Sequence, residues 1–194
     1  MKKAITVCLA LVLFALSCYG AEEFDFRKMR WDMTRKEIIA SEMDVLGEPS
    51  YNKPDSLRYR LKLSGLSAQL IYVFHEETCY IAMYMFNESH VNENGYIDDY
   101  EKIKKILTEK YGEPDVNRVL WKNDLYKNKP SKHGFAVSIG HLWYGATWVF
   151  PNGSAIIHIL SGENYKINHL LSYLSPEYDE IEKKKEEQEA SSNF

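Results

Sequence analysis

The chain contains few cysteines, which limits how its fold can be held together. Only three occur in 194 residues, and two of them, Cys8 and Cys18, lie close to the N terminus. If the first residues are removed, as argued below, Cys79 alone remains and no intramolecular disulfide can form. Roughly 155 residues then lie between the expected leader and the charged tail at 177–194, enough to bury a core without such cross-links.

The chain also lacks the motifs of the common enzyme classes. It has no Gly-x-Ser-x-Gly, no His-Glu-x-x-His and no glycine-rich phosphate loop. Its formal net charge is −4, and much of the acidic excess lies in residues 177–189. A body so close to neutral is not expected to bind nucleic acid, which requires a basic patch. We therefore expect a non-enzymatic protein with no cofactor and no nucleic-acid partner.

Long apolar runs are missing too, apart from one at the N terminus. Two lysines precede the uncharged, mostly apolar residues 4–16, and small residues follow. This order is typical of a secretory signal peptide, and the run is shorter than the roughly 20 residues that span a bilayer. We expect export to the periplasm or outer envelope, no membrane span, and cleavage after Gly20. The alternative is lipidation of Cys18, because residues 15–18 form an imperfect lipobox.

What the sequence does contain is a short pattern that occurs twice. The tripeptide Gly-Glu-Pro begins at Gly47 and again at Gly112, and in both copies an asparagine follows three residues after the proline. The repetition predicts an α+β fold of two tandem helix-plus-antiparallel-β-meander repeats, with the helices packed on one sheet face. The expected divisions are a signal peptide at 1–20, a first repeat at 21–95, a second repeat at 96–176 and a charged tail at 177–194.

Local signals place the helices of the two repeats. Thr34 and Glu37 have the spacing of a capping box, and the helix that they begin ends at Gly47. An apolar stripe at helical spacing precedes Gly112, which predicts the second helix. The members of this stripe are Ile97, Tyr100, Ile103, Leu107 and Tyr111.

Alternating apolar residues predict strands after each helix. The expected strands are residues 57–63, 68–75, 79–86, 119–121, 142–150, 155–160 and 167–174. The dipeptide at Asn152 and Gly153 favours a tight hairpin turn. The tail at 177–189 has only two apolar residues, so we expect a solvated helix or a disordered tail there, with a docking tail as the alternative.

A family resemblance lies in the first helix and its flanks. The segment from Trp31 to Ile38 reads Trp-Asp-Met-Thr-Arg-Lys-Glu-Ile, and residues 46–49 read Leu-Gly-Glu-Pro. Together they resemble the Gly-Met-Thr-x-x-Glu/Gln-Val and Leu-Gly-x-Pro pattern of the SmpA/OmlA (BamE) family of small outer-membrane lipoproteins, with Asp32 at the family's usual glycine. Two such units in tandem also resemble the β-lactamase-inhibitory-protein fold, in which a sheet face binds a partner. The resemblance implies a fold more than a function. The function that we expect is that of a non-enzymatic protein-binding module, in envelope assembly or as an inhibitor.

Aromatic residues gather on one face of two expected strands. Most of them should lie in the core, but aromatic side chains also serve as anchors in binding surfaces. The candidate partner-binding residues are Tyr80, Tyr84, Phe86, Tyr144 and Trp148. The opposite face of the strand at 79–86 is apolar as well, through Ile81, Met83 and Met85. That second face must be covered either by the other half of the protein or by a partner.

One cysteine and one histidine form the first candidate for chemistry. Cys79 is the thiol expected to remain in the mature chain, and His75 precedes it across a turn. A nucleophilic thiol needs a base and an open cleft, whereas Cys79 begins an apolar strand. We expect a buried structural cysteine, and a periplasmic hydrolase that uses this pair is the alternative function.

Two further histidines form the second candidate. A tight turn at residues 162–165 would place His158 opposite His169 on neighbouring strands. A metal site would need a third ligand, and the next strand offers only the region of Thr147 or Trp148. We expect two polar residues on a solvent-facing sheet surface and no metal, and a metal-binding enzyme is the alternative.

Overall fold

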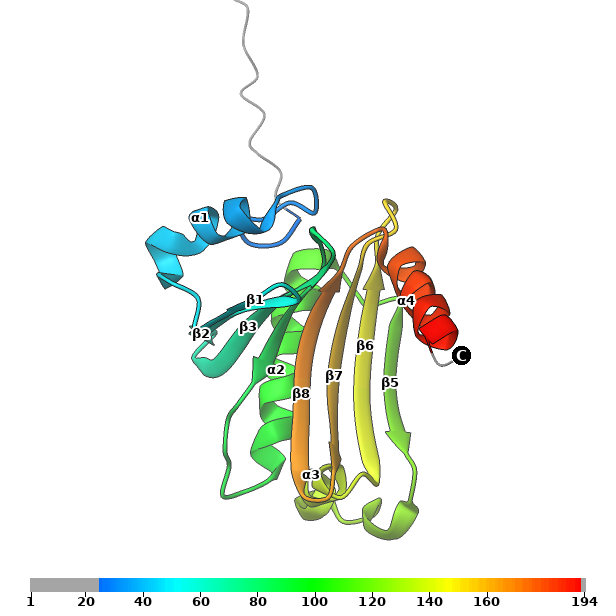
Figure 1. Ribbon diagram of the computed structural model, residues 1–194. Coiled ribbons are helices and arrows are strands. Elements are labelled where there is room, and N and C mark those ends of the chain that lie inside the picture. Colours follow the sequence, from blue (N-terminus) through cyan, green and yellow to red (C-terminus); the bar gives the residue numbers. More distant parts are fainter. Residues whose placement is uncertain (1–24, 193–194) are drawn as a thin grey trace, which may run out of the picture.

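The computed structural model describes residues 25–192, which form one antiparallel sheet with helices on both of its sides (Figure 1). The expected signal peptide and the Cys18 lipidation site lie outside the described residues. The helices are α1 (Arg35–Leu46), α2 (Asn94–Tyr111), α3 (His133–Ser138) and α4 (Tyr178–Ser192), with two short 3-10 turns, η1 (Asp124–Tyr126) and η2 (Pro130–Lys132). The strands are β1 (Tyr51–Lys53), β2 (Ser56–Leu63), β3 (Leu66–His75), β4 (Thr78–Phe86), β5 (Val116–Trp121), β6 (Leu142–Val149), β7 (Ala155–Glu163) and β8 (Lys166–Leu174).

The strands belong to a single sheet in the order β1-β2-β3-β4-β8-β7-β6-β5, and all neighbours are antiparallel. The two meanders join where β4 pairs with β8, from Ile81 opposite Leu174 to Phe86 opposite His169. The expectation of two tandem helix-plus-meander repeats is therefore wrong. Each meander alone would leave the backbone groups of its last strand unpaired, and the pairing of β4 with β8 satisfies both edges.

The helices do not all pack on one side of the sheet, which also corrects the expected fold. The side covered by α1, α2 and α3 is called the helix face. Ile38 of α1 and Ile103 of α2 belong to the same buried cluster as Tyr72 of β3, and Val137 of α3 packs in a second cluster. The opposite side is called the open face, and α4, drawn in red at the right of Figure 1, lies on it. The contacts of α4 with the sheet include β4.

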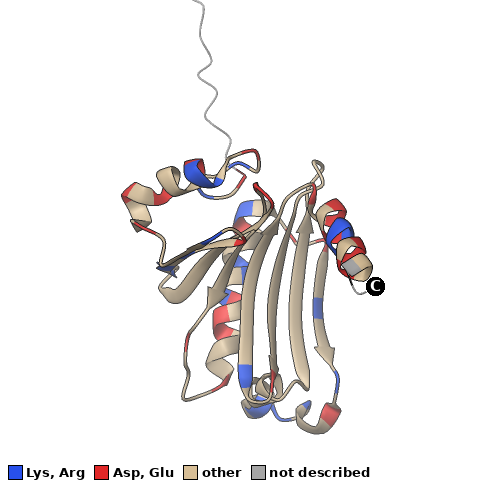
Figure 2. Cartoon of the chain, in the orientation of Figure 1, with Lys and Arg blue, Asp and Glu red and all other residues tan. Residues whose placement is uncertain are grey.

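The charged tail forms α4, and the first half of this helix docks on the sheet. Ile181 is buried, and the Tyr178 ring stacks on Tyr80 with centroids 6.1 Å apart. The Tyr80 hydroxyl donates a hydrogen bond of 2.9 Å to Glu182 and accepts one of 2.9 Å from Lys185. The rest of α4 is charged and exposed (Figure 2). The tail is thus a largely solvated helix, as expected, that is anchored by a short docking segment.

The sequence signals for helix ends are confirmed. Thr34 and Glu37 form both hydrogen bonds of the capping box at the start of α1. Gly47 ends α1 with a φ of 71°, and Gly112 ends α2 with a φ of 85°, values at which a side chain would be strained. Every expected strand is present, and the short strand β1 is additional.

Candidate functional site: the open face of the sheet

Apolar side chains form two neighbouring rows across the middle of the open face. Residues directly opposite each other on antiparallel strands point to the same side, so the register defines these rows. One row runs across β3, β4, β8 and β7 through Ile71, Met83, Ser172 and Ile157. The next row runs across β4, β8 and β7 through Met85, Leu170 and Ile159. Apart from Ser172, the two rows give the central strands an apolar surface.

The side chains of this apolar surface are not part of the hydrophobic core. None of its side chains belongs to, or packs against, either hydrophobic cluster of the described residues. All of them remain partly exposed. An antiparallel sheet with one solvated face normally carries polar residues on that face. Apolar rows in this position indicate a contact surface.

Basic side chains border the apolar rows at both margins of the sheet. Arg58, Arg60 and Lys62 alternate along β2 and point to the open face, and Arg58 lies opposite Ile71. At the other margin, Arg118 of β5 points to the same face. Figure 2 shows that the strands between these margins are nearly free of charged residues along most of their length. The open face therefore combines an apolar centre with basic borders.

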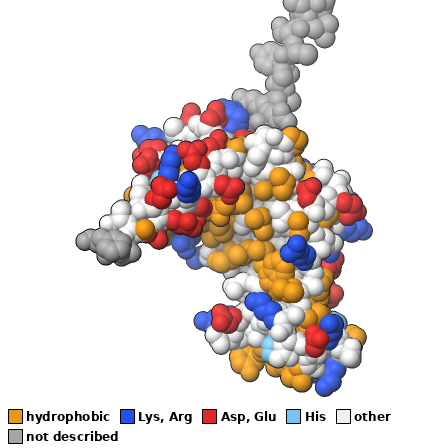
Figure 3. Space-filling view, turned by 90° about the vertical axis from the view of Figure 1, so that its right-hand side faces the viewer, with side chains coloured by type: hydrophobic (Ala, Val, Ile, Leu, Met, Phe, Trp, Pro, Cys, Tyr) orange, Lys and Arg blue, Asp and Glu red, His pale blue; other side chains and the backbone are white. Residues whose placement is uncertain are grey.

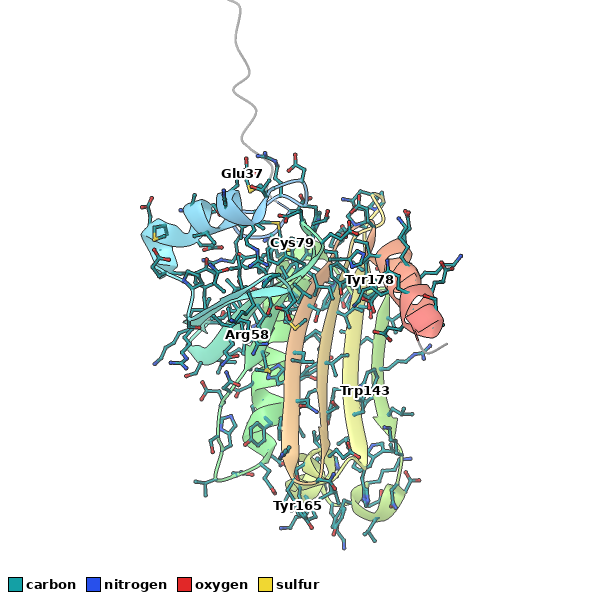
Figure 4. All side chains as sticks on the ribbon, in the orientation of Figure 1. Glu37, Arg58, Cys79, Trp143, Tyr165 and Tyr178 are labelled. Atoms are coloured by element: carbon teal, nitrogen blue, oxygen red, sulfur yellow. The ribbon has the colours of Figure 1, made fainter. Side chains whose placement is uncertain are left out.

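Trp143 and Gly145 form one end of the apolar surface. Both belong to β6 and, being two residues apart, point to the open face. A Cβ atom at Gly145 would lie 2.1 Å from the six-membered ring of Trp143, so the indole lies over the glycine. Trp143 is partly exposed near the middle of the sheet (Figure 4). A tryptophan held in this way has the character of a binding anchor.

The aromatic residues that the sequence suggested for partner binding lie elsewhere. Their exposed fractions are 2% for Tyr80, 4% for Tyr84, 6% for Phe86, 8% for Tyr144 and 2% for Trp148. Tyr80 contacts α4, and the others are buried on the helix face. The better signal was the apolar alternation of Ile81, Met83 and Met85. Because the two halves share one sheet, neither half covers this face of the other.

Cys79 and His75 do not form a catalytic pair. Cys79 is fully buried, and its thiol makes a weak hydrogen bond of 3.6 Å to the Ile81 carbonyl oxygen. Cys79 lies opposite Phe74 in the sheet, whereas His75 lies opposite Thr78. Burial raises the pKa of the Cys79 thiol to about 12. A thiol that stays protonated and has no solvent access is a structural core residue.

His158 and His169 do meet, but in the core and in a different register. The hairpin turns at Asn164 and Tyr165, both with positive φ, so Glu163 pairs with Lys166. His158 is therefore diagonal to His169, and their Nε2 atoms are 2.9 Å apart. The expectation of a solvent-facing pair is wrong, because both side chains are buried.

The surroundings of the histidine pair favour neutral rings rather than a bound metal ion. Tyr100 stacks on His158 with ring centroids 4.2 Å apart. Burial lowers the pKa of His169 to about 4, and burial together with His169 and Lys104 lowers the pKa of His158. Ala146 lies opposite His158 on β6 and has no ligand atom. Within residues 25–192, no group of three or more His, Cys, Asp and Glu residues could hold a metal ion.

A cleft of 1030 Å³ lies at one end of the sheet and is open to solvent. Its walls include the rings of Trp31, Phe150 and Tyr173. Several of its polar groups are engaged with one another: Asp25 accepts a hydrogen bond of 2.9 Å from the Trp31 backbone, and Arg30 pairs with Asp32 at 3.1 Å. A small-molecule site needs free polar groups that converge on the ligand. The open face is therefore the stronger candidate site.

Comparisons with known proteins identify no relative of this chain. No protein-family model, no curated protein and no solved structure matches this chain. In the part of the chain that the structure describes, no helix is both long and apolar enough to cross a membrane. The geometry of the open face is therefore the strongest indication of function.

Proposed function

We propose that the protein is an exported, non-enzymatic module of the cell envelope that binds another protein through its open face. The observation that carries this proposal is the apolar surface around Met83 and Leu170, which the core clusters leave out. Protein-binding surfaces commonly combine an apolar, poorly charged centre with a polar border. The open face has this composition.

The charges at the margins define the kind of partner. Arg58, Arg60 and Lys62 on one side, and Arg118 on the other, suit a protein that carries acidic side chains around an apolar patch. Complementary charges at a border mainly accelerate association and select the partner. We therefore expect binding to weaken as the salt concentration rises.

Export to the envelope is the part of the proposal that the N-terminal sequence supports. Two lysines, the apolar residues 4–16 and the small residues after them fit a leader that a signal peptidase removes. The similarity of residues 31–49 to the SmpA/OmlA (BamE) pattern is in keeping with this location. Mass spectrometry of the mature N terminus tests it: Ala21 or a lipid-modified Cys18 is expected, and a cytosolic protein that retains Met1 contradicts it.

Site-specific cross-linking tests the binding role. A photoreactive amino acid in place of Met83 should capture a partner in cells that express the protein at its natural level. The same amino acid in place of Ile106, which is 40% exposed on α2, should not capture that partner. The expected result is one dominant product from position 83. Equal patterns from the two positions, or none from position 83, would contradict the proposal.

A pair of isoleucine substitutions gives the matched control. Ile157→Lys places a charge in the middle of the apolar rows, and we expect it to weaken capture at least about tenfold, because a buried unpaired charge costs several kcal/mol. Ile106→Lys places the same charge on the outer side of α2 and should leave capture unchanged. If both variants behave alike, the open face is not the binding surface.

A further inference from the structure

The two edges of the sheet differ in how well they are protected. β1 is an edge strand of only three residues that carries Lys53 and is followed directly by Pro54. β5, at the other edge, has six residues and contains neither lysine nor proline. Short edge strands, lysine and proline are the usual means of preventing strand-to-strand association. β5, in which Arg118 is the one charged residue, therefore presents a less protected edge than β1.

The side chains of β5 are also unusually exposed and apolar for an edge strand. Val116 is 39% exposed, Val119 is 53% exposed and Leu120 is 50% exposed. Val119 and Leu120, together with Arg118, Lys122 and other neighbours, line a hollow of 560 Å³ that is open to solvent. Figure 3 views this side of the molecule and shows hydrophobic side chains gathered in its middle.

The backbone of β5 has a defined set of free groups. The Lys122 N–H donates a hydrogen bond of 2.8 Å to the His141 carbonyl oxygen, so Lys122 points toward β6. In an antiparallel ladder, successive residues point their backbone groups in opposite directions. Asn117, Val119 and Trp121 therefore direct their N–H and C=O groups away from the sheet, where a further strand would receive them.

We propose that β5 pairs with β5 of a second copy of this chain, antiparallel and about a two-fold axis that passes through Val119. In this register the outward-pointing Val119 of one copy faces Val119 of the other, and Asn117 faces Trp121. About six backbone hydrogen bonds would form across the axis. An axis perpendicular to the sheet keeps the open faces of both copies on the same side, so the two faces lie next to each other.

Charge repulsion disfavours the two neighbouring registers of this strand pair. A two-fold axis through residue 118 would place Arg118 directly opposite Arg118 of the second copy. An axis through Leu120 would place Arg118 opposite Lys122. Like charges directly opposite each other destabilise a strand pair. With the axis at Val119, Arg118 lies opposite Leu120 and Lys122 lies opposite Val116, so no like charges meet.

The expected dimer is weak and reversible. Pairing along one strand of six residues buries less than the roughly 1,200 Å² of a stable specific interface. Sedimentation velocity of the protein, purified in its exported form, should show a monomer–dimer equilibrium with a dissociation constant in the range of about 1–100 μM. A protein that stays monomeric up to about 1 mM would overturn the proposal.

Charge variants on the axis test the register. Val119→Lys and Val119→Glu should each dimerise at least about tenfold more weakly than the wild type, because identical charges then face each other. An equimolar mixture of the two variants should associate again, because Lys then faces Glu. Far-UV circular dichroism checks that both variants are folded. Unchanged dimerisation of Val119→Lys, or no association in the mixture, would overturn the Val119 axis.

Two controls separate this interface from other surfaces. Val45→Lys alters a valine that is similarly exposed, at 57%, but lies on α1, and it should dimerise like the wild type. Ile157→Lys alters the open face and should also leave the dimer intact. Loss of the dimer in either control, with retention in Val119→Lys, would refute pairing through β5.

A cysteine on the axis gives a second, independent measurement. Hydrogen-bonded residues opposite each other in an antiparallel pair have Cα atoms about 5.5 Å apart, a distance that a disulfide spans. Val119→Cys should form a dimer that reducing agents separate, and the buried Cys79 should not compete. Leu125→Cys, exposed to 61% beyond the end of β5, should stay largely monomeric. Equal cross-linking of the two variants would contradict the proposal.

Discussion

Arg27 donates two hydrogen bonds of 2.8 Å, one to each carboxylate oxygen of Glu42. Glu42 is fully buried, and the Tyr72 hydroxyl donates a third hydrogen bond of 2.6 Å to it. Burial alone would raise the pKa of Glu42, but the hydrogen bonds from Arg27 and Tyr72 outweigh it and hold the pKa below 4.5. The pair connects the N-terminal segment to α1 and to the sheet beneath it.

Removal of Arg27 should therefore destabilise the fold strongly. Arg27→Ala leaves the Glu42 carboxylate buried without its charged partner, and we expect the free energy of unfolding to fall by roughly 3–5 kcal/mol. Urea denaturation followed by tryptophan fluorescence measures this change. Arg30→Ala is the control, because Arg30 pairs with Asp32 at the surface and should contribute less than about 1 kcal/mol. Similar losses in the two variants would show that the buried pair has no special role.

The helix ends and most strand positions could be predicted because they depend on local chemistry. The Thr34–Glu37 capping box and the glycine at 47 act within a few residues of the backbone that they shape. The pairing of β4 with β8 depends on contacts between distant parts of the chain, such as Met83 with Ser172. No local pattern encodes which two edges meet, and the repeated tripeptide suggested two separate units instead of one sheet.

The register of the last hairpin was missed for a similar reason. Gly162 suggested the turn, but it belongs to β7, where a Cβ atom would lie 2.4 Å from the Val137 carbonyl oxygen of α3. Because Gly162 has no side chain, α3 can pack closely against β7. Asn164 and Tyr165 form the turn with positive φ, which a tyrosine seldom adopts. The large aromatic residues that the sequence suggested for binding lie in the core instead. The apolar residues Ile81, Met83 and Met85 were the better indication of the open face.

The thiol of Cys79 should be unreactive in the folded protein. Its complete burial and a pKa raised to about 12 keep it protonated and inaccessible at neutral pH. Ellman's reagent should modify it at least about a thousandfold more slowly in buffer than in denaturant, because reaction then requires unfolding. Fast, stoichiometric modification of the folded, exported protein would support the hydrolase alternative that uses Cys79 with His75.

The buried histidine pair should make stability depend on pH in the mildly acidic range. The folded-state pKa values of His158 and His169 lie below the ordinary value of 6.5, and that of His169 is about 4. Between pH 4 and pH 6.5 the unfolded chain binds protons that the folded chain does not. The free energy of unfolding is therefore greatest above about pH 6.5 and falls as the pH decreases toward 4.

One substitution tests how much of this pH dependence comes from the histidine pair. From pH 7 to pH 5 we expect a loss on the order of 2 kcal/mol for each histidine, measured by urea denaturation at both pH values. His169→Gln keeps a polar side chain but removes one titrating group, so its pH-dependent loss should be roughly half that of the wild type. His75→Gln, outside the buried pair, should keep the wild-type loss. An equal pH dependence in all three proteins would mean that the histidine pair does not cause the loss of stability at low pH. A larger loss in His169→Gln than in the wild type would contradict a lowered pKa of His169 in the folded state.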